Sequence, residues 1–72
     1  MESIDLRGVS CPLNYVKVKL KLEELGFGQE LEILLSDGEP IINVPRSAKE
    51  DGNKILEVEK IDDYFKVVLK KG

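Results

Sequence analysis

The sequence predicts an α+β fold, a two-layer α/β sandwich in which two helices cover one face of a four-stranded mixed sheet. Four segments have the pattern of strands and two that of helices, in the order βαβαββ. The chain has 72 residues, of which 42% are hydrophobic and 35% charged. This composition is typical of a folded chain, and its length fits one domain. We therefore expect residues 1–72 to form a single domain.

The first strand is expected at residues 3–6 and the first helix at 12–25. Residues 3–6 alternate polar and apolar side chains, as a strand does. Residues 15–22 also alternate, so this part is ambiguous. Four apolar residues nevertheless have helical spacing, namely Tyr15, Val18, Leu22 and Leu25. Because Pro12 opens the segment and Gly26 closes it, we interpret 12–25 as a helix.

This helix is expected to have a second apolar side. If the four helically spaced residues face the sheet, an opposite stripe is exposed to solvent beside two lysines. The stripe and its lysines are Leu13, Val16, Lys17, Leu20 and Lys21. A rimmed apolar stripe can mark a docking surface, so we predict that a partner protein binds there. The alternative is an ordinary solvated helix face.

The second half of the chain is expected to contain three strands and one helix. Residues 30–36 form a strand, and its continuously apolar part, 33–35, indicates burial on nearly both faces. Residues 41–51 are expected to be mostly helical, with a regular part from about Pro45 to Gly52, because proline breaks interior helical bonding. Two further strands, at 55–61 and 64–69, are joined by a tight turn.

The only cysteine lies in the stretch Arg7-Gly8-Val9-Ser10-Cys11-Pro12-Leu13-Asn14, between the first strand and the first helix. Proline is favoured at the first helical position, so Cys11 is predicted to be the helix N-cap. A sulfur there faces unpaired N–H groups and the positive end of the helix dipole. Both favour the reactive thiolate. The alternative is that Cys11 is a small buried apolar side chain.

The composition excludes several classes of site. The chain has no histidine, which removes Cys-His and Ser-His catalysis and the commonest transition-metal ligand. A single cysteine excludes an internal disulfide and a cysteine-cluster metal site. We therefore expect no metal or other cofactor. No apolar run has membrane-spanning length and no signal peptide is visible, so we expect a cytoplasmic protein without membrane association.

The charges are unevenly distributed along the chain. Residues 6–22 carry four of the 11 lysines and arginines and none of the 14 acids. A basic surround lowers the pKa of a thiol and attracts an acidic partner. The net charge of −3 argues against stable nucleic-acid binding.

Nearly the whole chain resembles the TusA/SirA-like sulfur-carrier family. Residues 5–12 resemble the family's N-terminal signature, in which a short strand leads into Cys-Pro-x-Pro at a helix start. Residues 30–37, followed by Pro40, resemble the second strand and its acidic loop. Residues 44–52 and 55–58 resemble the second helix and third strand. The resemblance implies the fold of the C-terminal domain of translation initiation factor 3, with sheet order 1-2-4-3 and one strand antiparallel to the others.

The resemblance also implies a function. Family members accept sulfane sulfur from a cysteine desulfurase or another donor, hold it as a persulfide on the signature cysteine, here Cys11, and pass it to an acceptor protein. The acceptor belongs to tRNA thiolation or another sulfur-trafficking pathway. We expect a monomer that acts with these partners. The alternative is a non-catalytic interaction or regulatory module whose cysteine is inert or redox-sensing.

Several residues are expected to support the sulfur. Pro12 fixes the helix start, and the backbone N–H groups of Leu13 and Asn14 are expected to stabilise the anion. Asn14 replaces the second proline of the family signature, so it restores one N–H donor. Arg7 and Arg46 are candidates for charge support or partner contact, with an ordinary surface arginine as the alternative for each.

Overall fold

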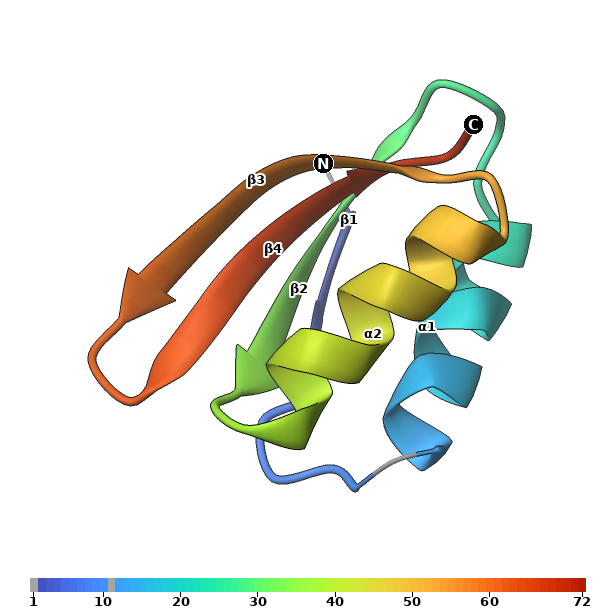
Figure 1. Ribbon diagram of the computed structural model, residues 1–72. Helices are drawn as coiled ribbons and strands as arrows, with labels where there is room; N and C mark the ends of the chain where they lie inside the picture. Colours follow the sequence, from blue (N-terminus) through green and yellow to red (C-terminus); the bar gives the residue numbers. More distant parts are fainter. Residues whose placement is uncertain (1, 11) are drawn as a thin grey trace.

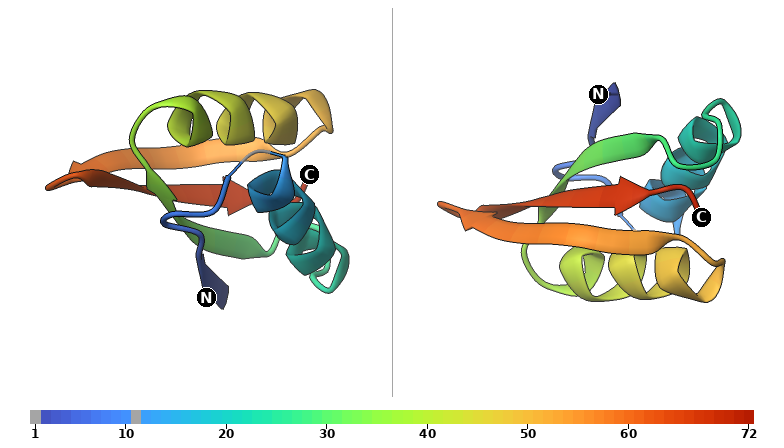
Figure 2. Two further views of the ribbon diagram at one scale, coloured as in Figure 1. Left: turned by 90° about the horizontal axis from the view of Figure 1, so that it is seen from below. Right: turned by 90° about the horizontal axis from the view of Figure 1, so that it is seen from above.

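The computed structural model describes residues 2–10 and 12–72 as a single sheet covered by two helices (Figure 1). The elements follow the predicted order: β1 (Glu2–Asp5), α1 (Leu13–Glu23), β2 (Glu30–Ser36), α2 (Glu39–Glu50), β3 (Lys54–Ile61) and β4 (Tyr64–Lys70). Both helices lie on the same face of the sheet, and its other face is uncovered (Figure 2). In the described residues neither helix combines the length and the apolar character needed to cross a membrane.

The sheet has the order β1-β2-β4-β3, as predicted. β1 is parallel to β2, and β4 is antiparallel to both of its neighbours, which makes β4 the single antiparallel strand. Because β1 and β2 are parallel, both end at the same edge of the sheet. Residues 6–10 follow β1 at this edge, and α1 and α2 both begin there (Figure 1). The topology therefore places the described residues that follow β1 beside the starts of the two helices.

The core lies between the sheet and the helices. It is built from alternate residues of β2 and β4 and from one side of each helix: Leu31, Ile33, Leu35, Val67, Leu69, Val18, Leu22, Val44 and Ala48. The predicted inward side of α1 is confirmed, since Val18 and Leu22 are buried and Tyr15 packs against the core. The prediction for residues 33–35 is wrong at Leu34, which is only half-buried. Its side chain faces the uncovered side of the sheet, so β2 alternates with period two.

The structure confirms that residues 41–51 are mostly helical and corrects the predicted start of the regular part. α2 begins at Glu39, six residues before Pro45. Pro40 stands in the first turn, where its missing N–H removes no helical hydrogen bond. Pro45 lies inside the helix, which continues through it while Val44 and Ala48 are fully buried against the sheet. Burial of this face therefore outweighs the local cost of the interior proline.

The predicted end of α2 at Gly52 is confirmed. The N–H of Gly52 donates to the carbonyl of Lys49 at 3.0 Å, and the N–H of Asn53 donates to the carbonyl of Ala48 at 3.0 Å. Gly52 has φ +92°, in the left-handed region that glycine adopts without strain. This pair of bonds is the Schellman arrangement, which satisfies the last free carbonyls of a helix.

Candidate functional site

The loop between β1 and α1 is attached to the end of β2. Leu6 is buried, and its N–H donates to the carbonyl of Leu34 at 2.9 Å. The N–H of Gly8 donates to Ser36 Oγ at 2.8 Å, and the N–H of Val9 donates to the carbonyl of Leu6 at 3.1 Å. Gly8 has φ +80°, so the chain turns here at a residue without a Cβ. These contacts fix the backbone that precedes the cysteine.

Arg7 is held by residues of the uncovered sheet face. Its guanidinium makes a two-pronged contact with the Asp5 carboxylate, at 2.8 and 3.0 Å, and stands 4.6 Å from the centre of the Tyr64 ring. Hydrogen bonds from the Arg7 side chain and then from its backbone N–H lower the pKa of Asp5 to about 2. Arg7 is therefore already paired, and its predicted role in supporting the sulfur stays a prediction.

The first turn of α1 differs from the prediction in two ways. Pro12 takes the position before the helix, which begins at Leu13, one residue later than expected. The backbone N–H of Asn14 donates to the carbonyl of Ser10 at 3.0 Å. This donor is used within the turn, so the expectation that it is free for the sulfur is wrong. Because Pro12 is the N-cap, the prediction that Cys11 takes this position is wrong. Cys11 itself lies outside the described part of the chain, and the role of the Leu13 N–H stays a prediction.

The Asn14 side chain is a feature that sequence reasoning missed. Within the described ranges Asn14 is the one fully buried polar residue. Its Oδ1 accepts a hydrogen bond from the backbone N–H of Tyr15 at 2.7 Å. Its Nδ2 has no partner among these residues. The only indication in the sequence is that Asn14 replaces the second proline of the family signature. That replacement predicts an additional backbone N–H but does not predict that the side chain is buried.

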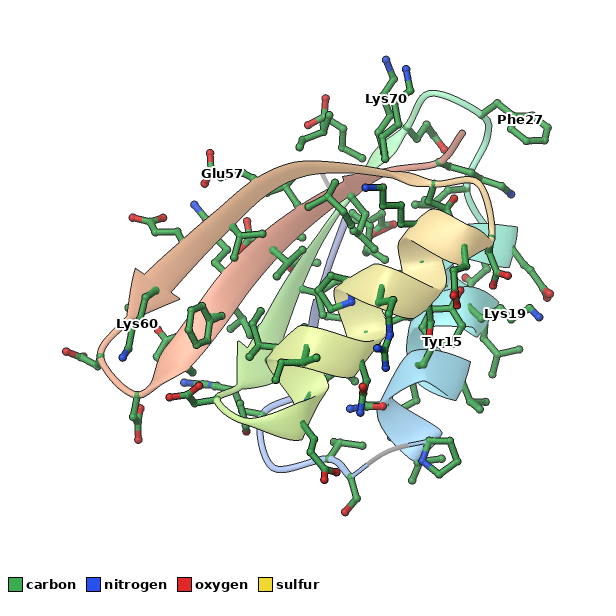
Figure 3. All side chains as sticks on the ribbon, viewed as in Figure 1. Tyr15, Lys19, Phe27, Glu57, Lys60 and Lys70 are labelled. Carbon is green, nitrogen blue, oxygen red and sulfur yellow. The ribbon has the colours of Figure 1, made fainter. Side chains whose placement is uncertain are left out.

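Tyr15 connects the first turn of α1 to the end of α2. Its hydroxyl donates to the carboxylate of Asp51 and lies 3.3 Å from the carbonyl oxygen of Ser47 (Tyr15 is labelled in Figure 3). Burial and the neighbouring Asp51 carboxylate raise the pKa of Tyr15 above its ordinary value. The partners lie more than 30 positions apart in sequence, so no local pattern predicts this link.

The apolar stripe on the outer side of α1 is present as predicted. Leu13, Val16 and Leu20 are 54%, 47% and 57% exposed, respectively. Lys17 is exposed beside them, whereas Lys21 is half-buried with its Nζ 3.9 Å from a carboxylate oxygen of Glu2. The structure therefore brings the predicted residues together on one surface. Their role in docking stays a prediction.

Arg46 has no described contact with the first turn of α1. It lies in α2, where its guanidinium donates to Asn43 Oδ1 at 2.8 Å on the same helix. Across residues 2–10 and 12–72, the hydrogen bond and ion-pair contacts of Arg46 are confined to α2. Charge support from Arg46 therefore stays a prediction.

The comparisons with known proteins agree with this architecture. The sequence model described as "Sulfurtransferase TusA" matches residues 2–71. A putative sulfur carrier protein of Archaeoglobus fulgidus is 35% identical over 71 residues, which cover 97% of this chain and 81% of the relative. Another, of Methanocaldococcus jannaschii, is 36% identical over 72 residues, which cover 99% of this chain and 95% of the relative.

A solved structure gives the same result at the level of the fold. The crystal structure of a SirA-like protein from Desulfitobacterium hafniense superposes with a TM-score of 0.85 at 27% sequence identity, covering 100% of this chain and 99% of that one. The family match extends over both helices and all four strands. The chain therefore belongs to the TusA sulfurtransferase family.

Proposed function

We propose that this protein is a sulfur carrier that holds sulfane sulfur as a persulfide on Cys11. It receives the sulfur from a cysteine desulfurase or a similar donor and delivers it to an acceptor protein. The observation that carries the proposal is the position of the chain's one cysteine, directly before Pro12 and α1, in a chain that the family matches over residues 2–71. The relatives' names as sulfur carriers support the same role.

The transfer requires only thiol exchange. The Cys11 thiolate attacks the outer sulfur of a donor persulfide, the donor S–S bond breaks, and the donor leaves as a thiolate while a new S–S bond forms on Cys11. An acceptor thiolate then attacks the outer sulfur on Cys11 in the same way. Electrons balance in each step, so no oxidant, metal or histidine is needed. The rate depends on the thiolate fraction and on access to the sulfur.

The test is the intact mass of the protein after incubation with a cysteine desulfurase and cysteine. We expect a gain of one sulfur atom on the native chain and none on Cys11→Ser. A missing gain with several different donors contradicts the carrier role. That result would favour the alternative, a non-catalytic interaction or regulatory module.

The α1 stripe is proposed to bind the sulfur donor or acceptor. Leu13, Val16 and Leu20 supply exposed apolar area, and Lys17 and Lys21 attract an acidic partner. Arg7 and Arg46 are proposed as further partner contacts. The acceptor is proposed to belong to tRNA thiolation or another sulfur-trafficking pathway, with residues 1–72 acting as one monomeric domain in the cytoplasm.

Two charge substitutions test the docking surface. Leu13→Glu and Leu20→Glu place a carboxylate on the stripe, so we expect slower sulfur loading with an unchanged free energy of unfolding, because both side chains are exposed. Ile42→Glu is the matched control, since Ile42 is 61% exposed on α2. If both α1 variants load sulfur and bind every partner as the control does, the stripe is not a docking surface.

A further inference from the structure

The dipeptide Asp-Gly occurs twice in the chain, once at each end of α2 (Figure 1). Asp37-Gly38 lies directly before the helix and Asp51-Gly52 directly after it, and all four residues are exposed to solvent. An aspartate followed by glycine can cyclise, because glycine has no side chain that hinders the attack of its amide nitrogen on the aspartate carboxyl group. The local sequence is the same in both copies, so the surrounding structure decides which of them reacts.

The side chain of Asp37 is folded against the nitrogen of the next residue. The N–H of Gly38 donates to Asp37 Oδ1 at 2.8 Å. Because Cγ is one bond of about 1.2 Å from Oδ1, Cγ lies within about 4 Å of that nitrogen. Reacting atoms in a productive arrangement are about 3–3.5 Å apart, so only a small movement is needed. Gly38 has φ +96°, and no packed neighbour lies within 4 Å of the position that a Cβ would occupy.

Asp51 is held in the opposite arrangement. Its ψ is 6°, so the nitrogen of Gly52 nearly eclipses the nitrogen of Asp51 and points away from its Cβ. A five-membered ring needs Cβ and the Gly52 nitrogen on the same side of the backbone. The carboxylate of Asp51 also accepts the hydroxyl of Tyr15, and the N–H of Gly52 donates to the carbonyl of Lys49 at 3.0 Å. Cyclisation at Asp51 would therefore break both hydrogen bonds and the end of α2.

We propose that Asp37 is a site of spontaneous isoaspartate formation in the folded protein and that Asp51 is protected from it. The nitrogen of Gly38 attacks Cγ of the protonated Asp37 carboxyl group and forms a C–N bond. The hydroxyl of that carboxyl group and the amide proton leave as water, which gives a cyclic imide. Water then opens the ring. Addition at Cγ restores aspartate, whereas addition at the backbone carbonyl breaks its bond to the Gly38 nitrogen and leaves the chain connected through Cγ.

The modification changes the main chain at the start of α2. The product has one additional carbon in the backbone and a free α-carboxylate, and its mass is unchanged because one water leaves and one is added. It directly follows Ser36, whose Oγ accepts the N–H of Gly8. A protein isoaspartyl methyltransferase methylates such an α-carboxylate, so we expect the modified chain to be a substrate of this enzyme class. The reaction is not a redox step, and it requires neither sulfur on Cys11 nor a partner protein.

The test is incubation of the folded native protein at mildly acidic pH, where part of the carboxyl group is protonated, followed by peptide mapping. Electron-transfer fragmentation distinguishes isoaspartate from aspartate at each position. We expect at least about tenfold more isoaspartate at Asp37 than at Asp51, because the geometry differs. In concentrated urea the fold is lost, and we expect comparable amounts at the two positions.

Two variants provide a second readout, the methyl groups that an isoaspartyl methyltransferase adds to the folded chain after incubation. Asp37→Glu keeps the charge but needs a larger ring, so we expect it to remove nearly all of the labelling. Asp51→Glu is the matched control and should retain it. Equal or greater isoaspartate formation at Asp51 in the folded protein overturns the proposal. A folded chain that is not labelled at all, or whose labelling persists in Asp37→Glu, overturns it as well.

Discussion

One phenol group joins the beginning of α1 to the end of α2. The hydroxyl of Tyr15 donates to the Asp51 carboxylate and lies 3.3 Å from the Ser47 carbonyl oxygen. Tyr15 also supplies the backbone N–H that orients Asn14. Tyr15 thus links the two helices and determines which way the Asn14 side-chain amide points. Residues at the end of α2 therefore help to position the first turn of α1, which follows the family signature.

Replacing Tyr15 by phenylalanine removes the hydroxyl and keeps the ring. We expect Tyr15→Phe to lose about 1–2 kcal/mol of unfolding free energy at neutral pH, because a hydrogen bond to a carboxylate is broken. Urea unfolding measures the loss. A decrease below about 0.3 kcal/mol, within the range of ordinary surface substitutions, would show that the link does not stabilise the fold.

The same tyrosine gives the fold a dependence on alkaline pH. Its pKa is raised above the ordinary 10.0 in the folded state. Its contribution to stability is therefore complete below pH 10 and is lost as the pH rises toward the folded pKa. We expect the native protein to lose more stability than Tyr15→Phe over this range. Tyr64→Phe, which keeps Tyr15, is the control and should lose as much as the native protein.

At the level of secondary structure, α2 shows how packing and end residues define a helix. Its apolar side is buried against the sheet on both sides of Pro45, so the interior proline does not end it. Its end is set by the left-handed conformation of Gly52 and by the two backbone bonds there. The local pattern predicts the end of this helix because the signal is one glycine. It does not predict that the regular helix already runs through Pro45, because that depends on contacts with distant strands.

A methyl group at Gly52 tests this helix end. No atom lies within 4 Å of the position that a Cβ would occupy, so the cost of Gly52→Ala arises from the backbone conformation alone. We expect a loss of about 1–2 kcal/mol in thermal or urea unfolding. Gly26→Ala is the control, because Gly26 has no positive φ and its Cβ would make only ordinary contacts with the Gln29 side chain. Equal losses in the two variants would contradict this account.

The stability of the whole molecule depends on a small hydrophobic core between the sheet and the two helices. A chain of 72 residues is expected to have about 4–11 kcal/mol of stability. Leu35→Ala in β2 removes a fully buried side chain, so we expect it to cost about 2–5 kcal/mol and to leave part of the protein unfolded at 37 °C. Leu34→Ala, on the uncovered face of the same strand, should cost clearly less. Circular dichroism during urea unfolding checks both, and equal costs would contradict the assigned faces.

Most of the architecture follows from short-range patterns. The helical spacing of Val18 and Leu22 and the strand period of residues 30–36 predict the buried faces, and the family resemblance supplies the strand order. The site is predicted less completely, because the contacts that hold its loop and first helical turn to β2 and to the end of α2 are long-range. Asn14 illustrates the limit: its identity was visible in the sequence, but its burial and unpaired Nδ2 depend on how α1 packs against the remaining structure.

The register of the sheet also determines where the protein can be tethered. Glu2 pairs with Leu31 and Lys70 pairs with Glu30, so both ends of the described chain lie at the start of β2. The loop before α1 is hydrogen-bonded to Ser36, at the C-terminal end of β2 (Figure 1). A tag, a solid support or a fused module attached at either end is therefore kept about one strand length away from the loop that precedes α1. Immobilisation through the termini leaves that edge open to large partners in solution.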